Sequence, residues 1–363
     1  MNLIFRFILF PLLFFVLINS LYAETSITVT LSTAVEAVLD SDDFNTAEMA
    51  RQIQDTSDLN GPFVANAFAL ANVLGYPIGK SYLGSFPHFE IGLAAGSGCT
   101  NMKYFDENDP AHDNDTLPMF APNAVLHFGI GIGGGVDILG KMFYVSKSVV
   151  NKYKSDIDYE TDVATLKDYK IYSVGGKIRY NFIPRKKFLP FYLAFGGLTF
   201  SLGGNFMYGD ISFTGDYQYD FENITVSGLP SGVPMHFDGA FDANIHWAIF
   251  TIDAQAVAYF DIFYLFSLYS GFGVAGNIGS FKVKFKGEGD FTTDTTYPPV
   301  LTTTDMGTLT FLSENKYRPS PVIPLYILGL EINILVLKLN AETMVNLLNR
   351  SDVNVQFGTR LQF

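Results

Sequence analysis

Cysteine, charged residues and long apolar helices are all scarce in this chain. Its 363 residues include one cysteine, Cys99, so no intrachain disulfide and no CxxC metal or redox motif can form. Charged residues make up 16% of the sequence, whereas soluble proteins carry about 25%. The net charge of −13 argues against nucleic acid as a partner. The 35 Phe and 20 Tyr suit a chain whose outer surface faces lipid.

The N-terminal residues contain one apolar run, at 7–18, which follows a single positive charge. Pro11 interrupts the run, and Asn19 ends it before it reaches the ~20 apolar residues that a membrane-spanning helix needs. This pattern is typical of a secretory signal peptide. We therefore predict a signal peptide at 1–23, cleaved after Ala23, and export of the remaining chain.

The C-terminal residues 353–363 alternate without a break between a mainly apolar face and a face of Asn, Gln, Gly and Arg. About 9 to 11 tilted residues cross a bilayer as one strand, with apolar side chains toward lipid and polar ones toward the lumen. A last strand that ends in Phe363 resembles the terminal signal of bacterial outer-membrane barrels. We therefore expect the outer membrane of a diderm bacterium as the location, with outer-membrane lipid and the barrel assembly machinery as partners.

The same period of two recurs along residues 86–363, which we interpret as an all-β membrane protein, an antiparallel transmembrane β-barrel of 10–14 strands. Ten strands can be read directly, and 190–219 and 235–262 are long enough to be split further. Tight turns are predicted at 139–141, 184–187, 260–264 and 336–338, and long polar outer loops at 96–122, 153–166, 222–234 and 286–319. The glycines at 131–135 are predicted to lie inside a strand and to leave room in the lumen.

Residues 24–85 do not alternate and are predicted to form an N-terminal helical plug, or hatch. Helices are expected at 34–39, at 46–53, and from Gly61-Pro62 to Gly75, where a glycine ends the last of them. The third helix is apolar enough to need burial against other protein. It either plugs the lumen or forms a periplasmic extension that lies under the barrel.

A helical segment of this kind ahead of a barrel resembles the FadL-type outer-membrane transporter family. The resemblance rests on Phe63–Gly75 and on the sequence Phe-Pro-His-Phe-Glu-Ile-Gly at 86–92. It implies a hatch inside the lumen, a ligand passed from an outer groove to an internal pocket, and release through a lateral opening. The expected function is transport of small hydrophobic molecules such as long-chain fatty acids. The alternatives are a general porin and a surface-exposed structural or adhesive barrel.

The candidate ligand-binding residues come from the plug and from the predicted inward faces. They are Phe63, Asn66, Phe68, Asn72, Leu74, His127, Lys177, Arg179, His236, Asp238, Asp242 and His246. The last four are predicted to face the lumen from one strand, opposite a lipid-facing row that includes Phe241 and Trp247, with a change of phase near Phe250. Alternate strand residues lie ~7 Å apart, which does not favour a shared metal ion. We find no catalytic constellation and predict neither enzymatic activity nor a cofactor.

Overall fold

The computed structural model describes residues 26–31, 46–76, 83, 86, 88–103, 116–153, 165–189, 193–224, 233–263, 265–293 and 305–363. The predicted signal peptide at 1–23 and the predicted helix at 34–39 lie outside these residues. Among the described residues, no helix has both the length and the apolar character needed to cross a membrane.

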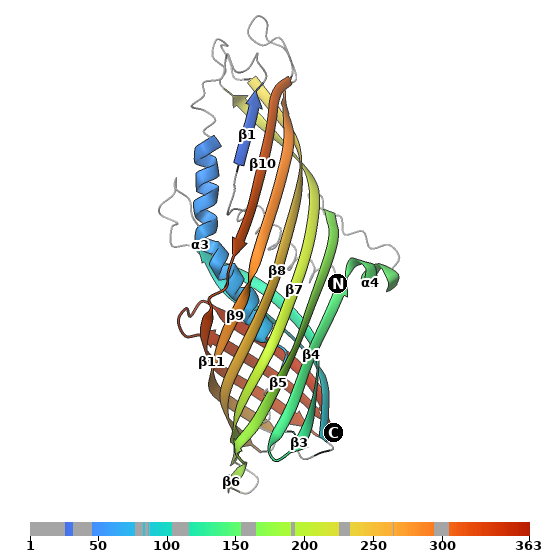
Figure 1. Cartoon of the computed structure of the whole chain (residues 1–363), viewed down its shortest axis with the longest axis vertical. Coiled ribbons are helices and arrows are strands. Elements are labelled where there is room, and N and C mark those ends of the chain that lie inside the picture. Colours follow the sequence, from blue (N-terminus) through green and yellow to red (C-terminus); the bar gives the residue numbers. More distant parts are fainter. Residues whose placement is uncertain are drawn as a thin grey trace, which may run out of the picture.

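The described elements are mainly long antiparallel strands (Figure 1). The two helices are α3 (Thr46–Val73) and α4 (Lys147–Tyr153). The strands are β1 (Ser26–Leu31), β2 (His88–Lys103), β3 (Thr116–Gly133), β4 (Val136–Ser146), β5 (Thr165–Ile183), β6 (Lys186–Leu189), β7 (Leu193–Ile224), β8 (Val233–Ile262), β9 (Phe266–Thr292), β10 (Asp305–Tyr317), β11 (Val322–Ile334), β12 (Leu337–Asn346) and β13 (Val353–Gln362).

Ten of these strands close a ring in the order β2-β3-β4-β5-β7-β8-β9-β11-β12-β13, and β13 pairs with β2 to complete it. Apolar side chains such as Phe357 and Phe272 point outward, and polar ones such as Asn354, Gln356 and Arg360 are buried in the lumen. This alternation is what lipid outside and polar contacts inside require. The predicted transmembrane barrel is therefore confirmed, and the segments at 190–219 and 235–262 are not split.

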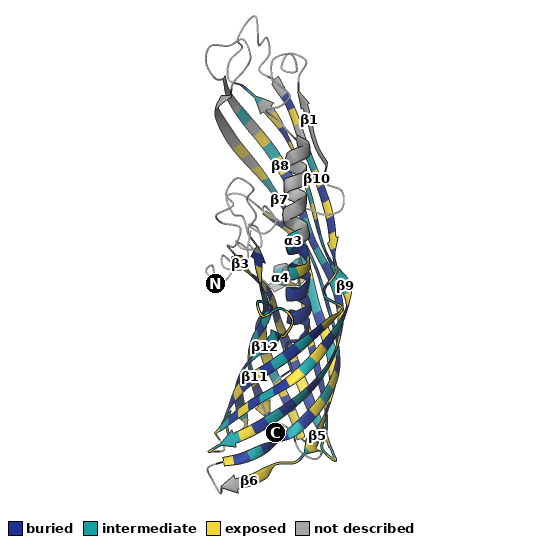
Figure 2. Ribbon diagram, turned by 90° about the vertical axis from the view of Figure 1, so that its left-hand side faces the viewer, coloured by how far each residue is buried: buried dark blue, intermediate teal, exposed yellow. Residues whose placement is uncertain are grey.

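Strands β7, β8 and β9 continue beyond the ring, where β10 and β1 extend the sheet, and we call this part the extension (Figures 1 and 2). Along β8 the side chains keep alternating at Phe250, but the two faces exchange character. Below it Thr251 and Asp253 are buried and Ile252 is exposed, whereas above it Trp247 is buried. The solvent on the outer face changes there from lipid to water, so the hydrophobic pattern reverses without a slip in the strand.

Several predicted boundaries are wrong. Residues 139–141 continue β4, and the turn lies instead at Gly134-Gly135, where the glycines adopt positive φ. The predicted loops at 96–122 and 286–319 are largely strand, because β2, β3, β9 and β10 run further than expected. Residues 26–31, within the segment predicted to be helical, form β1 on the edge of β10.

Helix α3 is one continuous helix where the sequence predicts two, at 46–53 and from residue 61. Pro62 lies inside it, and Figure 1 shows the helix bending as it enters the barrel. A proline removes one backbone hydrogen bond and bends a helix. At this bend Gly61 lies against the ring of Tyr317 on β10, so closely that a Cβ at this position would clash with the ring. The glycine therefore allows the helix to pack against β10. Gly75 follows the helix with φ of 101°, as predicted for a C-terminal glycine.

Candidate functional site

The C-terminal half of α3 lies inside the barrel and is buried from Val64 to Leu74. Phe68 stacks on Phe281 of β9, with ring centroids 5.1 Å apart, and contacts Trp247 of β8 at 4.6 Å. These aromatic contacts lie where the inner face of the barrel wall turns apolar toward the extension. The predicted plug is therefore present in the lumen, and the alternative of a helix under the barrel is excluded.

Asparagine side chains fix this helix to β7 and β8 and to the segment that precedes β11. The amide of Asn72 donates to the carbonyl oxygens of Asn205 and Ile249, at 3.2 and 3.1 Å, and to the Thr251 hydroxyl at 3.1 Å. Asn66 accepts a 2.7 Å hydrogen bond from the backbone N–H of Ser320. Because buried amides are costly unless they are bonded, these contacts also fix the depth of the helix in the lumen.

Lys141 of β4 binds the C-terminal end of the plug. Its buried ammonium group donates to the carbonyl oxygens of Asn72 and Leu74 and lies 5.1 Å from the ring centroid of Tyr76. The last carbonyl groups of a helix lack partners within the helix and carry its negative dipole end, so a cation stabilises them. Across the lumen, the Gln356 side chain accepts a 2.9 Å hydrogen bond from the Gly75 N–H.

Below the plug, buried ion pairs fill the described part of the lumen. Lys177 lies 2.8 Å from Asp253, and Arg179 lies 2.8 Å from Asp137. Arg360 bridges two acids from different strands and is fully buried, with nitrogen–oxygen distances of 3.0 Å to Glu90 and 2.7 Å to Glu331. Breaking a buried pair of this kind costs about 3–5 kcal/mol. With the helix above them, these charged side chains are held in place and kept out of contact with water.

The barrel wall is open along part of the boundary between β3 and β4. These strands pair only from the turn up to Leu126 and Met142. Beyond this point β3 continues to pair with β2, and β4 with β5. Pro118 and Pro122 both lie in the stretch of β3 that has no β4 partner. Because proline cannot donate to a strand ladder, both prolines suit a free edge.

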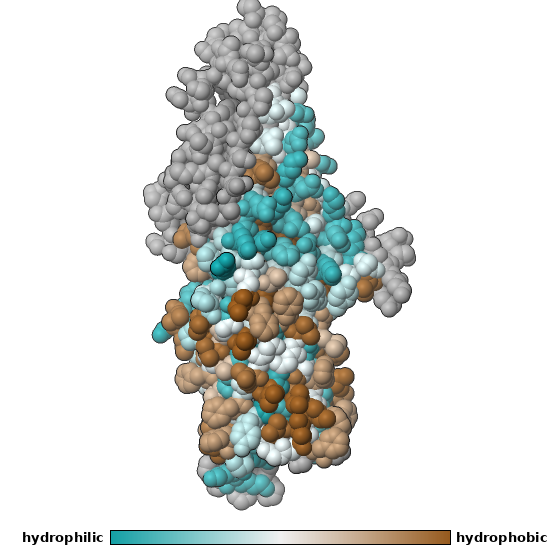
Figure 3. Space-filling view, in the orientation of Figure 1, coloured by the Kyte–Doolittle hydropathy of each residue, from teal (hydrophilic) through white to brown (hydrophobic). Residues whose placement is uncertain are grey.

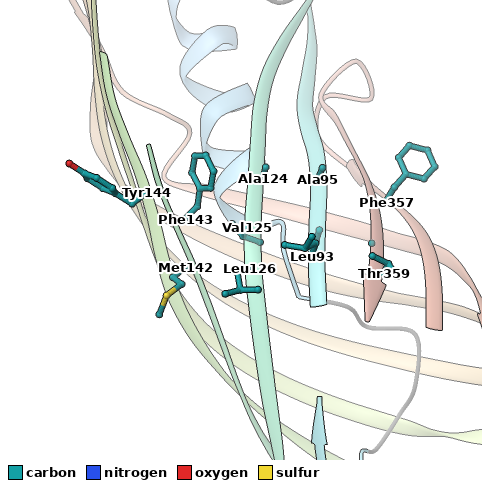
Figure 4. Close-up of a pocket in the computed structure, with 12 residues that line it drawn as sticks. Leu93, Ala95, Ala124, Val125, Leu126, Met142, Phe143, Tyr144, Phe357 and Thr359 are labelled. Atoms are coloured by element: carbon teal, nitrogen blue, oxygen red, sulfur yellow. The ribbon is translucent and has the colours of Figure 1, made fainter. Parts of the chain in front are cut away.

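An apolar groove of about 660 Å³ lies on the wall at the foot of this split. We call it the wall groove. Figure 4 shows β3 and β4 diverging above Leu126 and Met142, with α3 visible between them and Phe143 beside the helix. The groove is lined by Leu93, Ala94, Ala95, Ala124, Val125, Leu126, Met142, Phe143, Tyr144, Phe357, Gly358 and Thr359.

The plug is held from both sides of the split. From β3, the Asn123 amide donates to the carbonyl oxygen of Ala71 at 2.8 Å. From β4, Lys141 binds the carbonyl oxygens that follow on the helix. A Cβ on Gly75 would lie 2.3 Å from Val125, so the end of the plug is in close contact with the inner side of the groove. The helix therefore stands directly behind an opening that faces the bilayer.

The structure places eight of the twelve predicted ligand-binding residues on the plug or on the inner face of the barrel wall, without showing a single site that all of them share. The plug supplies half-buried Phe63 and buried Asn66, Phe68, Asn72 and Leu74, and the wall supplies buried His127, Lys177 and Arg179. The predicted orientation of His236, Asp238, Asp242 and His246 is wrong, because they lie on the outer face of the extension while Phe241 and Trp247 point inward. The reversal of polarity at Phe250 explains the error. Among the described residues, no group of three His, Cys, Asp or Glu side chains could hold a metal.

Sequence reasoning missed Lys141 and Asn123 as residues that hold the plug. Lys141 was placed in a turn, although it shares the parity of Asp137, an inward position four residues earlier in the same strand. The signal that could have found Lys141 is its spacing: it lies four residues after Asp137, so a continued strand places both side chains on the inward face. Asn123 shares the parity of His127, but nothing in the sequence indicates its helix partner.

The fit between plug and wall predicts the effect of a single methyl group. A Cβ on Gly98 of β2 would lie 1.9 Å from the carbonyl oxygen of Ala67, so Gly98→Ala should displace the helix and destabilise the protein by about 1–3 kcal/mol. Gly204→Ala is the control, because the nearest atom to its Cβ would be 3.7 Å away. Urea unfolding in lipid vesicles measures both variants, and equal stabilities would contradict the contact.

Comparison with solved structures shows similarity to bacterial outer-membrane β-barrels at low identity. The translocator domain of autotransporter NalP from Neisseria meningitidis is 9% identical, with a TM-score of 0.28, and the match covers 77% of this chain and 89% of that chain. The transport unit of AIDA-I from Escherichia coli is 12% identical (TM-score 0.31, 84% and 98% covered). The Ralstonia pickettii toluene transporter TbuX is 10% identical (TM-score 0.22, 84% and 98% covered). Scores of this size support no functional argument.

The match to a family model covers more of this chain than the matches to solved structures do. No curated protein matches the chain in sequence. A family model described as Lsa36-like matches residues 20–363, and this match does not confirm the FadL-type family. Since the model covers nearly the whole sequence, the chain belongs to the Lsa36-like family.

Proposed function

We propose that this barrel carries small hydrophobic molecules, such as long-chain fatty acids, across the outer membrane and releases them sideways through the split between β3 and β4. The observation that supports this function is the coincidence of three features: a missing strand pairing, an apolar wall groove at its foot, and the plug directly behind it. An unpaired strand edge at membrane depth is costly, so its presence needs a role.

The chemistry of the groove favours an apolar ligand. Its volume of about 660 Å³ lies within the range of small-molecule sites, and its lining includes Leu93, Leu126, Met142 and Phe357. Such a molecule leaves water for lipid without passing through a charged lumen. The plug argues against a general porin, because the helix is buried in the lumen and keeps the ion pairs Lys177–Asp253 and Arg179–Asp137 below it out of contact with water.

The inner face of the extension supplies an approach to the split. Phe241 and Phe285 stack there with centroids 5.4 Å apart, and Phe285 meets Phe311 at 5.3 Å. Phe281 continues this aromatic surface down to Phe68 of the plug. A hydrophobic solute would follow the aromatic side chains to α3 and reach the split when the helix end moves away from Lys141.

Filling the wall groove tests this route. Ala95 and Ala124 are two of its small lining residues, and Ala95→Trp with Ala124→Trp should block it. We expect uptake of a labelled long-chain fatty acid by cells carrying the variant to fall about tenfold, equivalent to roughly 1.4 kcal/mol. The control is Ala254→Trp with Ala256→Trp, which fills a groove of about 630 Å³ on a wall where β7, β8 and β9 pair continuously.

The two grooves distinguish lateral release from a general effect on the barrel. A loss of uptake in the first variant alone supports the route, provided that both variants fold to the same heat-modifiable form. Equal uptake in both variants and the parent would contradict it. In that case the exposed sheet of the extension would favour the second candidate function, a surface-exposed structural or adhesive barrel.

A further inference from the structure

The outer face of the extension carries a row of charged residues just beyond the apolar band of the barrel. Strand register places Lys170, Asp210, His246, Lys282 and Lys316 side by side across β5, β7, β8, β9 and β10. We call these five residues the interface row. Figure 3 shows the hydrophilic surface of this region directly above the hydrophobic band.

The rows below it fix its depth relative to the bilayer. One side-chain step down, Tyr172 and Tyr208 stack with ring centroids 4.9 Å apart. One step further down, Val174, Phe250 and Ile278 are exposed apolar residues. Tyrosines of this kind mark the edge of the hydrocarbon in outer-membrane barrels, and alternate residues are ~7 Å apart along a strand. On β9, Lys282 therefore lies two side-chain steps beyond the exposed Ile278, at the level of the lipid headgroups, and Lys316 of β10 lies beside it.

The sign of the charge changes with distance from the bilayer. The interface row holds three lysines and one aspartate, although the whole chain has a net charge of −13. Two steps beyond it, Asp242 lies beside Lys286, and their charges offset each other. Four steps beyond it, Asp238 lies beside Asp290. Positive charge is thus concentrated at headgroup depth, and negative charge is kept away from the membrane.

Lys282 and Lys316 face each other directly across β9 and β10. Like charges in this position destabilise a sheet unless an anion lies between them. Within the described residues, no acidic side chain pairs with either lysine, whereas the next lysine, Lys284, lies 3.5 Å from Glu314. The one acid of the row, Asp210, is bound by His246 at 3.2 Å and by Asn244 at 2.8 Å.

We propose that the interface row binds the phosphate of an anionic lipid headgroup, in the leaflet next to the extension, with Lys282 and Lys316 as its principal ligands. Lysine recognises phosphate as a point charge, and both stems rise from the same face of the sheet beside the hydrocarbon edge. The lipid would hold the extension at a fixed height above the bilayer. This inference does not depend on the transported molecule.

Native mass spectrometry of the full-length protein in detergent tests the proposal with two lipids that share the same acyl chains, dilauroyl phosphatidylglycerol and dilauroyl phosphatidylcholine. The protein should bind phosphatidylglycerol more tightly. In Lys282→Gln with Lys316→Gln this preference should fall by roughly fivefold for each lysine removed. Lys284→Gln with Lys286→Gln removes the same charge from the same face and should retain it, since both lysines lie 3.5 Å from a glutamate.

Three results would overturn the proposal. The first is unchanged preference in the Lys282 and Lys316 variant, and the second is an equal loss in both variants, which would indicate general charge attraction. The third is displacement of phosphatidylglycerol by inorganic phosphate at the same concentration, which would show a site for free phosphate. Retention of the heat-modifiable form in both variants establishes that the barrel itself is intact.

Discussion

Removal of residues 24–79 is expected to turn a closed barrel into one that conducts ions. The deleted segment contains α3 and β1, neither of which belongs to the ring of ten strands, so the barrel should still close. Loss of the helix removes the side chains that fill the lumen beside Trp247 and exposes Lys177 and Arg179 to water. We expect steady channels in planar bilayers where the intact chain gives none, together with loss of bound fatty acid.

A single substitution should reproduce part of this effect. Lys141→Met keeps the size of the side chain but removes its hydrogen bonds to Asn72 and Leu74, so the helix end should move and give brief channel openings. Lys186→Met, at an exposed site next to the β5–β6 turn, is the control and should stay closed. Unchanged conductance in the deletion would contradict the plug, and a silent Lys141→Met variant would contradict the role of this lysine in holding it.

The second large effect concerns the boundary between lipid and water along β9. Phe272 is 62% exposed on the outer face at membrane depth, so Phe272→Arg should destabilise the folded barrel by about 2–4 kcal/mol. Glu288→Arg places the same side chain on the same strand and face, but in the extension, where it contacts water. The fraction of heat-modifiable protein after refolding into vesicles, followed by urea unfolding, measures both.

The expected difference between these two variants depends only on the position of the membrane edge. Glu288→Arg also removes an exposed ion pair with Lys286, which contributes at most about 1 kcal/mol. Similar stabilities for the two variants would show that the outer face of β9 meets the same solvent along its length. That result would contradict the reversal of polarity described for β8.

The sequence predicts the barrel well because lipid and lumen impose a strict alternation on every strand. Phe357 and Ile130 face outward and Gln356 faces inward as predicted. The same rule failed for His236–His246, because it assumes lipid on one face of the whole strand. Once β8 leaves the bilayer, apolar side chains turn inward and polar ones outward. The change of phase near Phe250 was visible in the sequence, but its cause was the change of solvent.

Other features depend on contacts between distant segments, which one sequence does not reveal. The break expected at Gly61-Pro62 is absent because the packing of the helix in the barrel and against Tyr317 outweighs the weak local propensity. The wall opening arises because β3 and β4 diverge, and its only indication in the sequence is Pro118 and Pro122, which cannot donate a hydrogen bond to a neighbouring strand. The partner of Lys141 could not be inferred, because backbone carbonyl groups carry no sequence signal.

Because β2 and β13 close the ring, the order of folding steps in this protein is constrained. The two strands are far apart in the chain, yet Gly98 opposes Asn354 across the seam and both lie against the helix, with the Asn354 amide bonded to the carbonyl oxygen of Leu70. Contacts between distant segments form late in folding. A helix held on all sides would have great difficulty entering a finished ring. In the intact chain, helix α3 must therefore already be in position when the last strand arrives, so the ring closes around a helix that is already there.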